Sequence, residues 1–157
     1  MLGTQDKSFT RLLSAIDASQ LASADAGNQL VVQAGYTAFK PSSDMELFDF
    51  CSADDLERHL QEADLVITHA GVGSIVSALT HHKRVIAAAR KAAYKEMGND
   101  HQSDILQAFA RAGYLIALED FDRLDDAVTE ALRFTPKPYV RNIDGILETI
   151  TTYIDTH

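Results

Sequence analysis

Short apolar runs of strand type alternate along this chain with longer amphipathic segments of helix type. Runs rich in branched or aromatic apolar residues predict strands over residues 30–33, 45–50, 65–68, 85–89 and 114–118. Apolar residues three or four positions apart predict helices over residues 8–18, 52–62, 101–112, 124–134 and 143–154, and a further helix that starts at Ser74. Strands separated by helices favour a parallel sheet with helices on both faces, which is a Rossmann-like α/β fold.

The start of the chain departs from this alternation. Met1 to Gln5 lead into the first predicted helix within a few residues, which leaves almost no room for a first strand. We therefore expect a first strand that is short or missing, either because the sheet lacks it or because the start of the protein has been lost. The pair Gly3 and Thr4 stands directly before a helix and predicts a small turn that faces an anion.

A glycine turn follows the strand predicted over residues 65–68. The chain there reads His69-Ala-Gly-Val-Gly-Ser74 and continues into a helical run. Gly71 and Gly73 allow a sharp turn and a close approach of a ligand to the backbone. The first amides of a helix have no partner within the helix, and the helix dipole places about half a positive charge behind them. This stretch therefore predicts an anion-binding site.

Several kinds of nucleotide and metal site are disfavoured. The dinucleotide-binding fingerprint requires a third glycine or alanine where this chain has Val76, and an acidic residue at the end of the next strand, where it has Arg90. A phosphate-binding loop of the Gly-Lys-Ser/Thr kind is absent, as is any Cys, His or carboxylate set with metal-ligand spacing. We expect neither a metal nor a cofactor.

Length and charge narrow the class of protein further. The 157 residues fit one domain, and the net charge of −9 disfavours binding to a nucleic acid, which requires a clustered basic surface. No apolar run approaches the ~20 residues of a membrane span, and no signal segment is evident. The single cysteine, Cys51, excludes a disulfide within the chain. We expect a single cytoplasmic domain over residues 1–157.

Two motifs together resemble a known family. The first is His69-Ala-Gly-Val-Gly-Ser74; the second, after Arg90 on the next strand, is Glu96-Met-Gly-Asn99-Asp100-His101-Gln102. The pair is similar to the C-terminal, nucleotide-sugar-binding domain of glycosyltransferase family 28, the donor-binding half of a GT-B enzyme. The likeness covers residues 2 to about 118, and it is greatest to the small stand-alone members that act in dolichol-linked glycan synthesis or bacterial exopolysaccharide synthesis.

The resemblance implies a role for each motif, and each role has a purely structural alternative. The loop His69 to Ser74 would hold the donor diphosphate; alternatively, Ser74 only caps its helix and His69 is a buried histidine satisfied by backbone. Arg90 would offset the diphosphate charge, or form a surface ion pair of little energetic value. The second motif would contact the sugar and ribose, or Asp100 would only cap the next helix. The implied nucleotide-sugar-binding residues are Gly3, Thr4, His69, Gly71, Gly73, Ser74, Arg90, Glu96, Asn99, Asp100, His101 and Gln102.

The activity implied by the resemblance is inverting transfer of a sugar (GlcNAc, Glc or Gal) from a UDP-sugar to a lipid-linked acceptor. No residue can be assigned as the general base, because the acceptor side of such enzymes lies on another domain. The resemblance therefore implies a heteromer with a membrane-anchored, acceptor-binding subunit that recruits the chain to the inner face of the membrane. The helix predicted over residues 143–154 would dock this subunit or pack on its own sheet. The alternatives are a non-catalytic UDP-sugar-binding module, and an unrelated flavodoxin-like domain that binds another phosphate.

Overall fold

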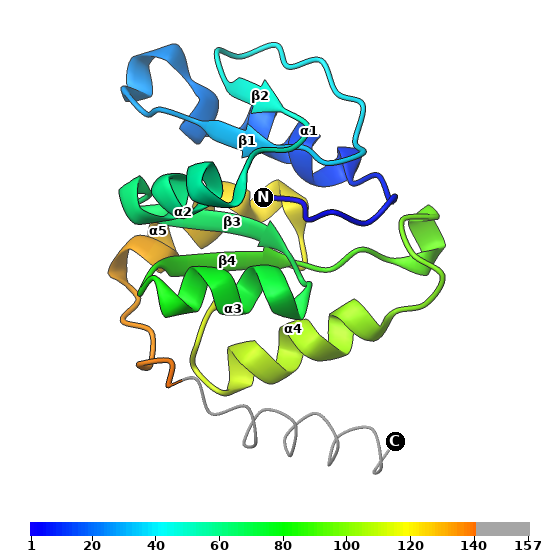
Figure 1. The fold of residues 1–157 in the computed structure, drawn as a ribbon, viewed down its shortest axis with the longest axis vertical. Helices are drawn as coiled ribbons and strands as arrows, with labels where there is room; N and C mark the ends of the chain where they lie inside the picture. The colour runs from blue at the N-terminus through cyan, green and yellow to red at the C-terminus, as the bar shows by residue number, and fades with distance from the viewer. Residues whose placement is uncertain (141–157) are drawn as a thin grey trace.

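The strands of the protein form two parallel sheets. A computed structural model of the chain describes residues 1–140 (Figure 1). The first sheet pairs β1 with β2, with Val31 opposite Glu46. The second has the order β3-β4-β5, with Leu65 opposite Arg84. The strands are β1 (Val31–Gln33), β2 (Glu46–Phe48), β3 (Leu65–His69), β4 (Arg84–Ala88) and β5 (Ile116–Ala117).

Helices connect the strands from β2 onward, close to the predicted positions, whereas the segment between β1 and β2 holds no helix. The α-helices are α1 (Thr10–Ala18), α2 (Ala53–Glu62), α3 (Val72–Thr80), α4 (His101–Arg111) and α5 (Leu124–Arg133), and the short 3₁₀ turns are η1 (Gln20–Ala22), η2 (Ala24–Ala26), η3 (Ala92–Tyr94) and η4 (Phe121–Arg123). The Ser52 hydroxyl caps α2 by accepting a hydrogen bond from the Asp55 amide at 3.1 Å. Gly113 follows α4 with a φ of 81°, which stops the helix. The helix predicted over residues 143–154 lies outside the described residues.

The central strand β4 is buried on both faces. Ile86 and Ala88 point into one apolar cluster, which α1 and α5 cover. Val85 and Ala87 point into the other, which is formed mainly by α3 and α4. Burial on both sides explains why this strand reads as a continuous apolar run. The predicted α/β fold, a parallel sheet with helices on both faces, is confirmed (Figure 1).

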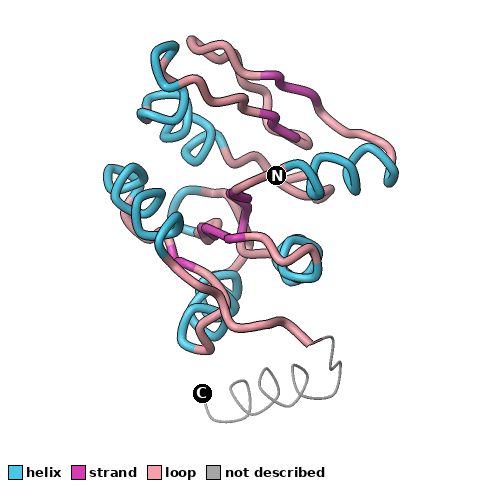
Figure 2. Tube along the Cα trace, turned by 90° about the vertical axis from the view of Figure 1, so that its left-hand side faces the viewer, coloured by secondary structure: helices cyan, strands magenta, loops and turns pink. Residues whose placement is uncertain are grey.

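The first two residues lie between the two sheets. The Met1 amino group donates to the Ile67 carbonyl at 2.8 Å, and the His69 amide donates to the Met1 carbonyl at 3.4 Å. On the other side, the Leu2 amide donates to the Gln33 carbonyl at 3.0 Å. The views in Figures 1 and 2 both place the N-terminus between β1 and β3. Residues 1 and 2 thus link the two sheets through backbone hydrogen bonds.

The described helices are short relative to a lipid bilayer. Within residues 1–140 none is both long enough and apolar enough to cross a membrane.

Candidate functional site

The loop after β3 presents unpaired amides at the start of α3. Gly71 is the N-cap, and Ile75 makes the first intrahelical bond, to the Gly71 carbonyl at 3.0 Å. The amides of Val72, Gly73 and Ser74 therefore have no partner within the helix. The helix begins before Ser74, the start expected from the sequence, so Ser74 lies in the first turn and is not the N-cap. Gly73 is exposed, and the space beside it is open.

The His69 ring fits between Gly3 and Gly71 because neither residue has a Cβ atom. A Cβ added at Gly3 would lie 2.6 Å from the His69 Cε1 atom, and one added at Gly71 would collide with the Nε2 atom of the same ring. The imidazole is therefore held between the Gly3–Thr4 turn and the glycine loop. These two turns, which the sequence predicted separately, lie against one another at the carboxyl end of β3.

The environment of His69 favours a neutral ring. Its side chain is 6% exposed, and its pKa is lowered to about 4, mainly by burial and then by the positive charges of Arg90 and the amino terminus. Its Nδ1 atom has no hydrogen-bond partner among residues 1–140. A neutral imidazole can still donate one hydrogen bond.

Gly71→Ala should lower the free energy of unfolding by about 1–3 kcal/mol, because the new methyl group collides with the His69 ring. Urea unfolding measures this effect. In the double variant with His69→Ala the cost of the methyl group should largely disappear. Gly73→Ala is the matched control, since its methyl group meets nothing within 4 Å and should not destabilise the protein. Strictly additive effects at Gly71 and His69 would contradict this packing.

Arg90 is completely buried at the end of β4. Its Nη2 atom donates to the carbonyls of Leu2 at 3.0 Å and Lys7 at 3.1 Å, and its guanidinium lies 5.2 Å from the centre of the Phe9 ring. Burial lowers the pKa of Arg90, although the Glu96 charge opposes the shift. Its Nε and Nη1 atoms have no hydrogen-bond partner among the described residues. The alternative of a surface ion pair is therefore wrong, and Arg90 holds the loop over residues 2–7 against the sheet.

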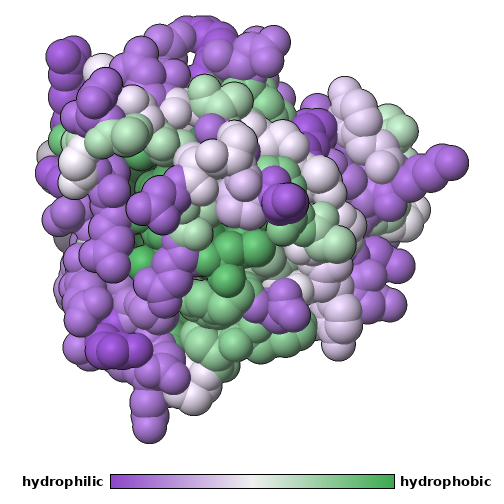
Figure 3. All heavy atoms as spheres, turned by 90° about the horizontal axis from the view of Figure 1, so that it is seen from above, coloured by the Kyte–Doolittle hydropathy of each residue, from purple (hydrophilic) through white to green (hydrophobic). Residues whose placement is uncertain are grey.

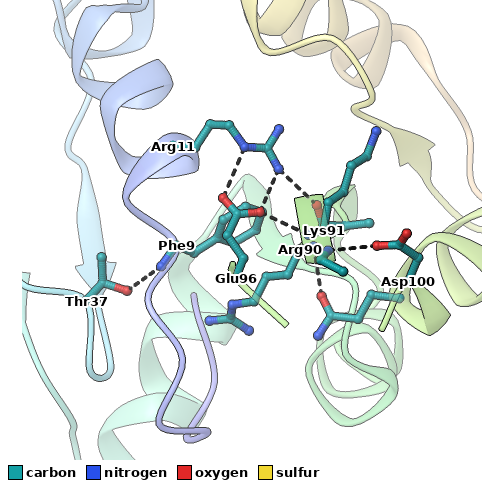
Figure 4. Close-up of polar contacts among 10 residues, drawn as sticks. Phe9, Arg11, Thr37, Arg90, Lys91, Glu96 and Asp100 are labelled. Carbon is teal, nitrogen blue, oxygen red and sulfur yellow. Dashed lines mark hydrogen bonds and ion pairs between the residues drawn. The ribbon is translucent and has the colours of Figure 1, made fainter. Parts of the chain in front are cut away.

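Glu96 is bound by an arginine that the sequence analysis did not identify. Arg11 on α1 donates to both carboxylate oxygens of Glu96, at 3.1 and 2.8 Å, although 85 positions separate the two residues (Figure 4). The Arg11 guanidinium lies 4.3 Å from the Tyr94 ring centre and 4.1 Å from that of Phe121. Glu96 also accepts from the Lys91 amide at 3.0 Å. These bonds fix the loop between β4 and α4, and direct contact of Glu96 with a ligand stays a prediction.

The rest of the second motif divides into buried and exposed residues. Gln102 is buried, and its Oε1 atom accepts from the Arg90 amide at 3.1 Å. Asp100 is the N-cap of α4, but its side chain makes no capping bond; its carboxylate accepts from the Ala92 amide at 2.8 Å (Figure 4). Asn99 and His101 are exposed.

The predicted site residues divide into a buried group, which shapes the loops, and a group that is exposed to solvent. His69, Arg90, Glu96 and Gln102 are buried and shape the two loops. The groups open to solvent are Thr4, Gly73, Asn99, Asp100 and His101. Within residues 1–140, no group of three or more His, Cys, Asp or Glu side chains is placed to hold a metal ion. The exposed set offers amides, hydroxyls and carboxylates at the carboxyl end of a parallel sheet, where open α/β folds bind ligands.

Three related proteins share the same description, "UDP-N-acetylglucosamine transferase subunit ALG13". The chain is 32% identical to that of Candida albicans over 52% of its own length, 29% identical to that of Mus musculus over 69%, and 36% identical to that of Eremothecium gossypii over 48%. The matched parts cover only 26%, 10% and 36% of those relatives' lengths. A solution NMR structure of ALG13 aligns with a TM-score of 0.47 and 25% identity, over 68% of this chain and 51% of that one.

The family model described as "Glycosyltransferase family 28 C-terminal domain" matches residues 3–151, which include both predicted motifs. The chain belongs to the glycosyltransferase family 28 C-terminal domain family.

Proposed function

We propose that this chain binds a UDP-sugar, with the donor diphosphate at the amino end of α3. The observation that carries the proposal is the set of unpaired first-turn amides of Val72, Gly73 and Ser74, next to the turn at Gly3. The helix dipole and these amides together favour an anion. The exposed side chains of Asn99, Asp100 and His101 would contact the sugar and ribose.

The reaction that we propose is inverting transfer of the sugar to a hydroxyl group. The bond between the anomeric carbon and the phosphate oxygen breaks, a bond to the acceptor oxygen forms, and the acceptor proton passes to a base. UDP leaves with an added negative charge, which the amides of α3 would stabilise. We assign no residue of this chain as the base and place that group on the acceptor side.

The name of the relatives supports part of the proposal for the donor and the partner. Their name, UDP-N-acetylglucosamine transferase subunit, favours GlcNAc as the sugar and a complex of more than one chain. We propose a lipid-linked acceptor in glycan or polysaccharide synthesis, held by a membrane-anchored subunit that brings this cytoplasmic chain to the inner face of the membrane. A non-catalytic UDP-sugar-binding module remains the second candidate.

Gly73→Asp should reduce the affinity for UDP-GlcNAc at least about tenfold without destabilising the protein. A carboxylate in the first turn repels the diphosphate, whereas it interacts favourably with the helix dipole. The space beside Gly73 is open, so the side chain fits. Isothermal titration calorimetry measures the affinity, and UDP-glucose and UDP-galactose rank the sugars.

Gly73→Asn is the matched control, because it has nearly the same shape without the charge. We expect it to bind UDP-GlcNAc more tightly than the Asp variant does. Equal affinities for the two variants would show that the charge is not sensed. A wild-type protein that binds no UDP compound would end the nucleotide-sugar proposal.

His101→Ala should slow sugar transfer at least about tenfold, because the exposed His101 side chain would contact the proposed donor. The assay follows labelled UDP-GlcNAc with membranes of the source cell. His82→Asn is the control, since His82 lies beyond α3 and its φ of 55° suits asparagine. Binding without transfer in every preparation would favour the non-catalytic module. Equal rates for both variants would remove His101 from the site.

A further inference from the structure

Arg90 is the one charged side chain within residues 1–140 that has no exposed surface. Hydrophilic side chains border the face of the molecule seen in Figure 3, and an arginine is almost never fully buried unless a carboxylate pairs with it. No carboxylate bonds to Arg90 among the described residues; its guanidinium bonds to the carbonyls of Leu2 and Lys7. Because burial of an unpaired charge is costly, we expect Arg90 to have a role beyond packing.

One nitrogen atom of Arg90 closes the loop over residues 2–7. The Nη2 atom donates to the Leu2 carbonyl at 3.0 Å and to the Lys7 carbonyl at 3.1 Å, so both ends of the loop are held at a single point. In Figure 4 the guanidinium points away from Asp100, toward the ribbon of this loop. Within residues 1–140, no hydrogen bond ties residues 3–6 to another segment of the chain. We call the two bonds from Nη2 the Arg90 clasp.

The loop that the Arg90 clasp closes forms one side of the proposed donor site. Gly3 lies against the His69 ring, and Gly71 of the glycine loop lies against the same ring. Thr4 follows Gly3 and is exposed. A shift of the loop would therefore move the Gly3–Thr4 turn relative to the first turn of α3.

The backbone and the stem of Arg90 are held as well, which fixes the origin of the clasp. Its amide donates to the Gln102 Oε1 atom at 3.1 Å, in the first turn of α4. Its guanidinium lies 5.2 Å from the centre of the Phe9 ring. Arg90 thus connects the loop over residues 2–7 to the second motif, on the other side of the proposed site.

We propose that Arg90 is a positioning residue of the donor site: it sets the Gly3–Thr4 turn beside α3 and does not itself touch the diphosphate. Two observations argue against direct contact. The side chain has no surface for a ligand to reach, and both hydrogens of Nη2 are used by backbone carbonyls. The ligand in this inference rests on the proposed UDP-sugar binding, whereas the clasp is measurable without a nucleotide.

Arg90→Lys tests the clasp, because lysine keeps the positive charge but is shorter and lacks the planar fork that reaches both carbonyls. NMR relaxation without nucleotide should show a fall in the order parameters of the Thr4, Gln5 and Asp6 amides, from about 0.85 to below about 0.6. The affinity for UDP-GlcNAc, measured by calorimetry, should fall at least about tenfold because the turn is no longer held in place.

Arg84→Lys is the matched control. Arg84 begins the same strand, is exposed, and donates to the Phe134 carbonyl at 3.4 Å, so its replacement should change neither quantity. Arg90→Met is a second variant, which removes the charge and the donors but keeps an apolar stem suited to a buried site. It should give both effects, and it decides the proposal if the lysine variant does not fold.

Three results would overturn the positioning role. An ordered loop in both variants would mean that the clasp does not hold it. A mobile loop with unchanged affinity would leave Arg90 a purely structural residue. Affinity kept in Arg90→Lys but lost in Arg90→Met would mean that the charge acts directly on the diphosphate. A wild-type protein that binds no UDP compound would end the nucleotide-sugar proposal, while the order parameters would still decide whether Arg90 sets the loop.

Discussion

Replacing Glu96 by alanine should lower the free energy of unfolding by about 3–5 kcal/mol, because it leaves a partly buried arginine without its counter-ion. The Glu96 side chain is 8% exposed and the Arg11 side chain is 24% exposed. Two hydrogen bonds join them, and the carboxylate also accepts from the Lys91 amide. Removal of the carboxylate therefore leaves the Arg11 charge without its counter-ion and the Lys91 amide without its acceptor. Urea unfolding at pH 7.5 measures the loss.

A double-mutant cycle separates this ion pair from simple loss of packing. Arg11→Met alone should also destabilise, and the double variant should lose less than the sum of the single effects. Asp126→Ala is the control. Asp126 forms an ion pair with Arg123, and the two side chains are 71% and 70% exposed. Such an exposed pair should contribute at most about 1 kcal/mol. A loss at Glu96 no larger than that at Asp126 would contradict the structural role of the buried pair.

Acidification should destabilise the protein through His69, by up to about 3 kcal/mol between pH 6.5 and pH 4. The pKa of the ring is lowered from 6.5 to about 4 in the folded protein, mainly by burial. The folded state therefore favours the neutral ring, and the unfolded chain takes up a proton first as the pH falls. This contribution to stability is fully present above pH 6.5 and is lost as the pH approaches 4.

Comparison with His69→Asn isolates this contribution, because other groups also titrate in the same range. Urea unfolding of both proteins at several pH values between 4 and 7.5 gives two profiles, and the wild type should fall more steeply. Parallel profiles would mean that His69 has an ordinary pKa in the folded protein.

The order of strands and helices was predictable from the sequence because their signals are local. The apolar run of β4 reflects burial on both faces, and the start of α2 at Ser52 and the end of α4 at Gly113 depend on residues close by in the chain. The glycine loop was predictable for the same reason, since a strand, a turn and a helix follow one another directly. The start of α3 was misplaced because Val72 and Gly73 carry no strong helix signal, although Gly71 serves as the N-cap.

The contacts that hold the site together were not predictable. Arg11 and Glu96 are 85 positions apart, and neither has a sequence pattern that points to the other. The burial of Arg90 depends on the loop over residues 2–7, whose path is a tertiary property. The position of Gly3 against His69 depends on how residues 1 and 2 enter between the sheets. Long-range packing of this kind has no local signature.

The most direct test of the donor site at the amino end of α3 is an NMR titration of ¹⁵N-labelled protein with UDP-GlcNAc. We expect saturable shifts of the amides of Gly3, Gly73 and Ser74, with smaller changes at Thr129 on α5. No saturable shift at millimolar ligand, or shifts centred away from the amino end of α3, would contradict the proposal that this helix holds the donor diphosphate.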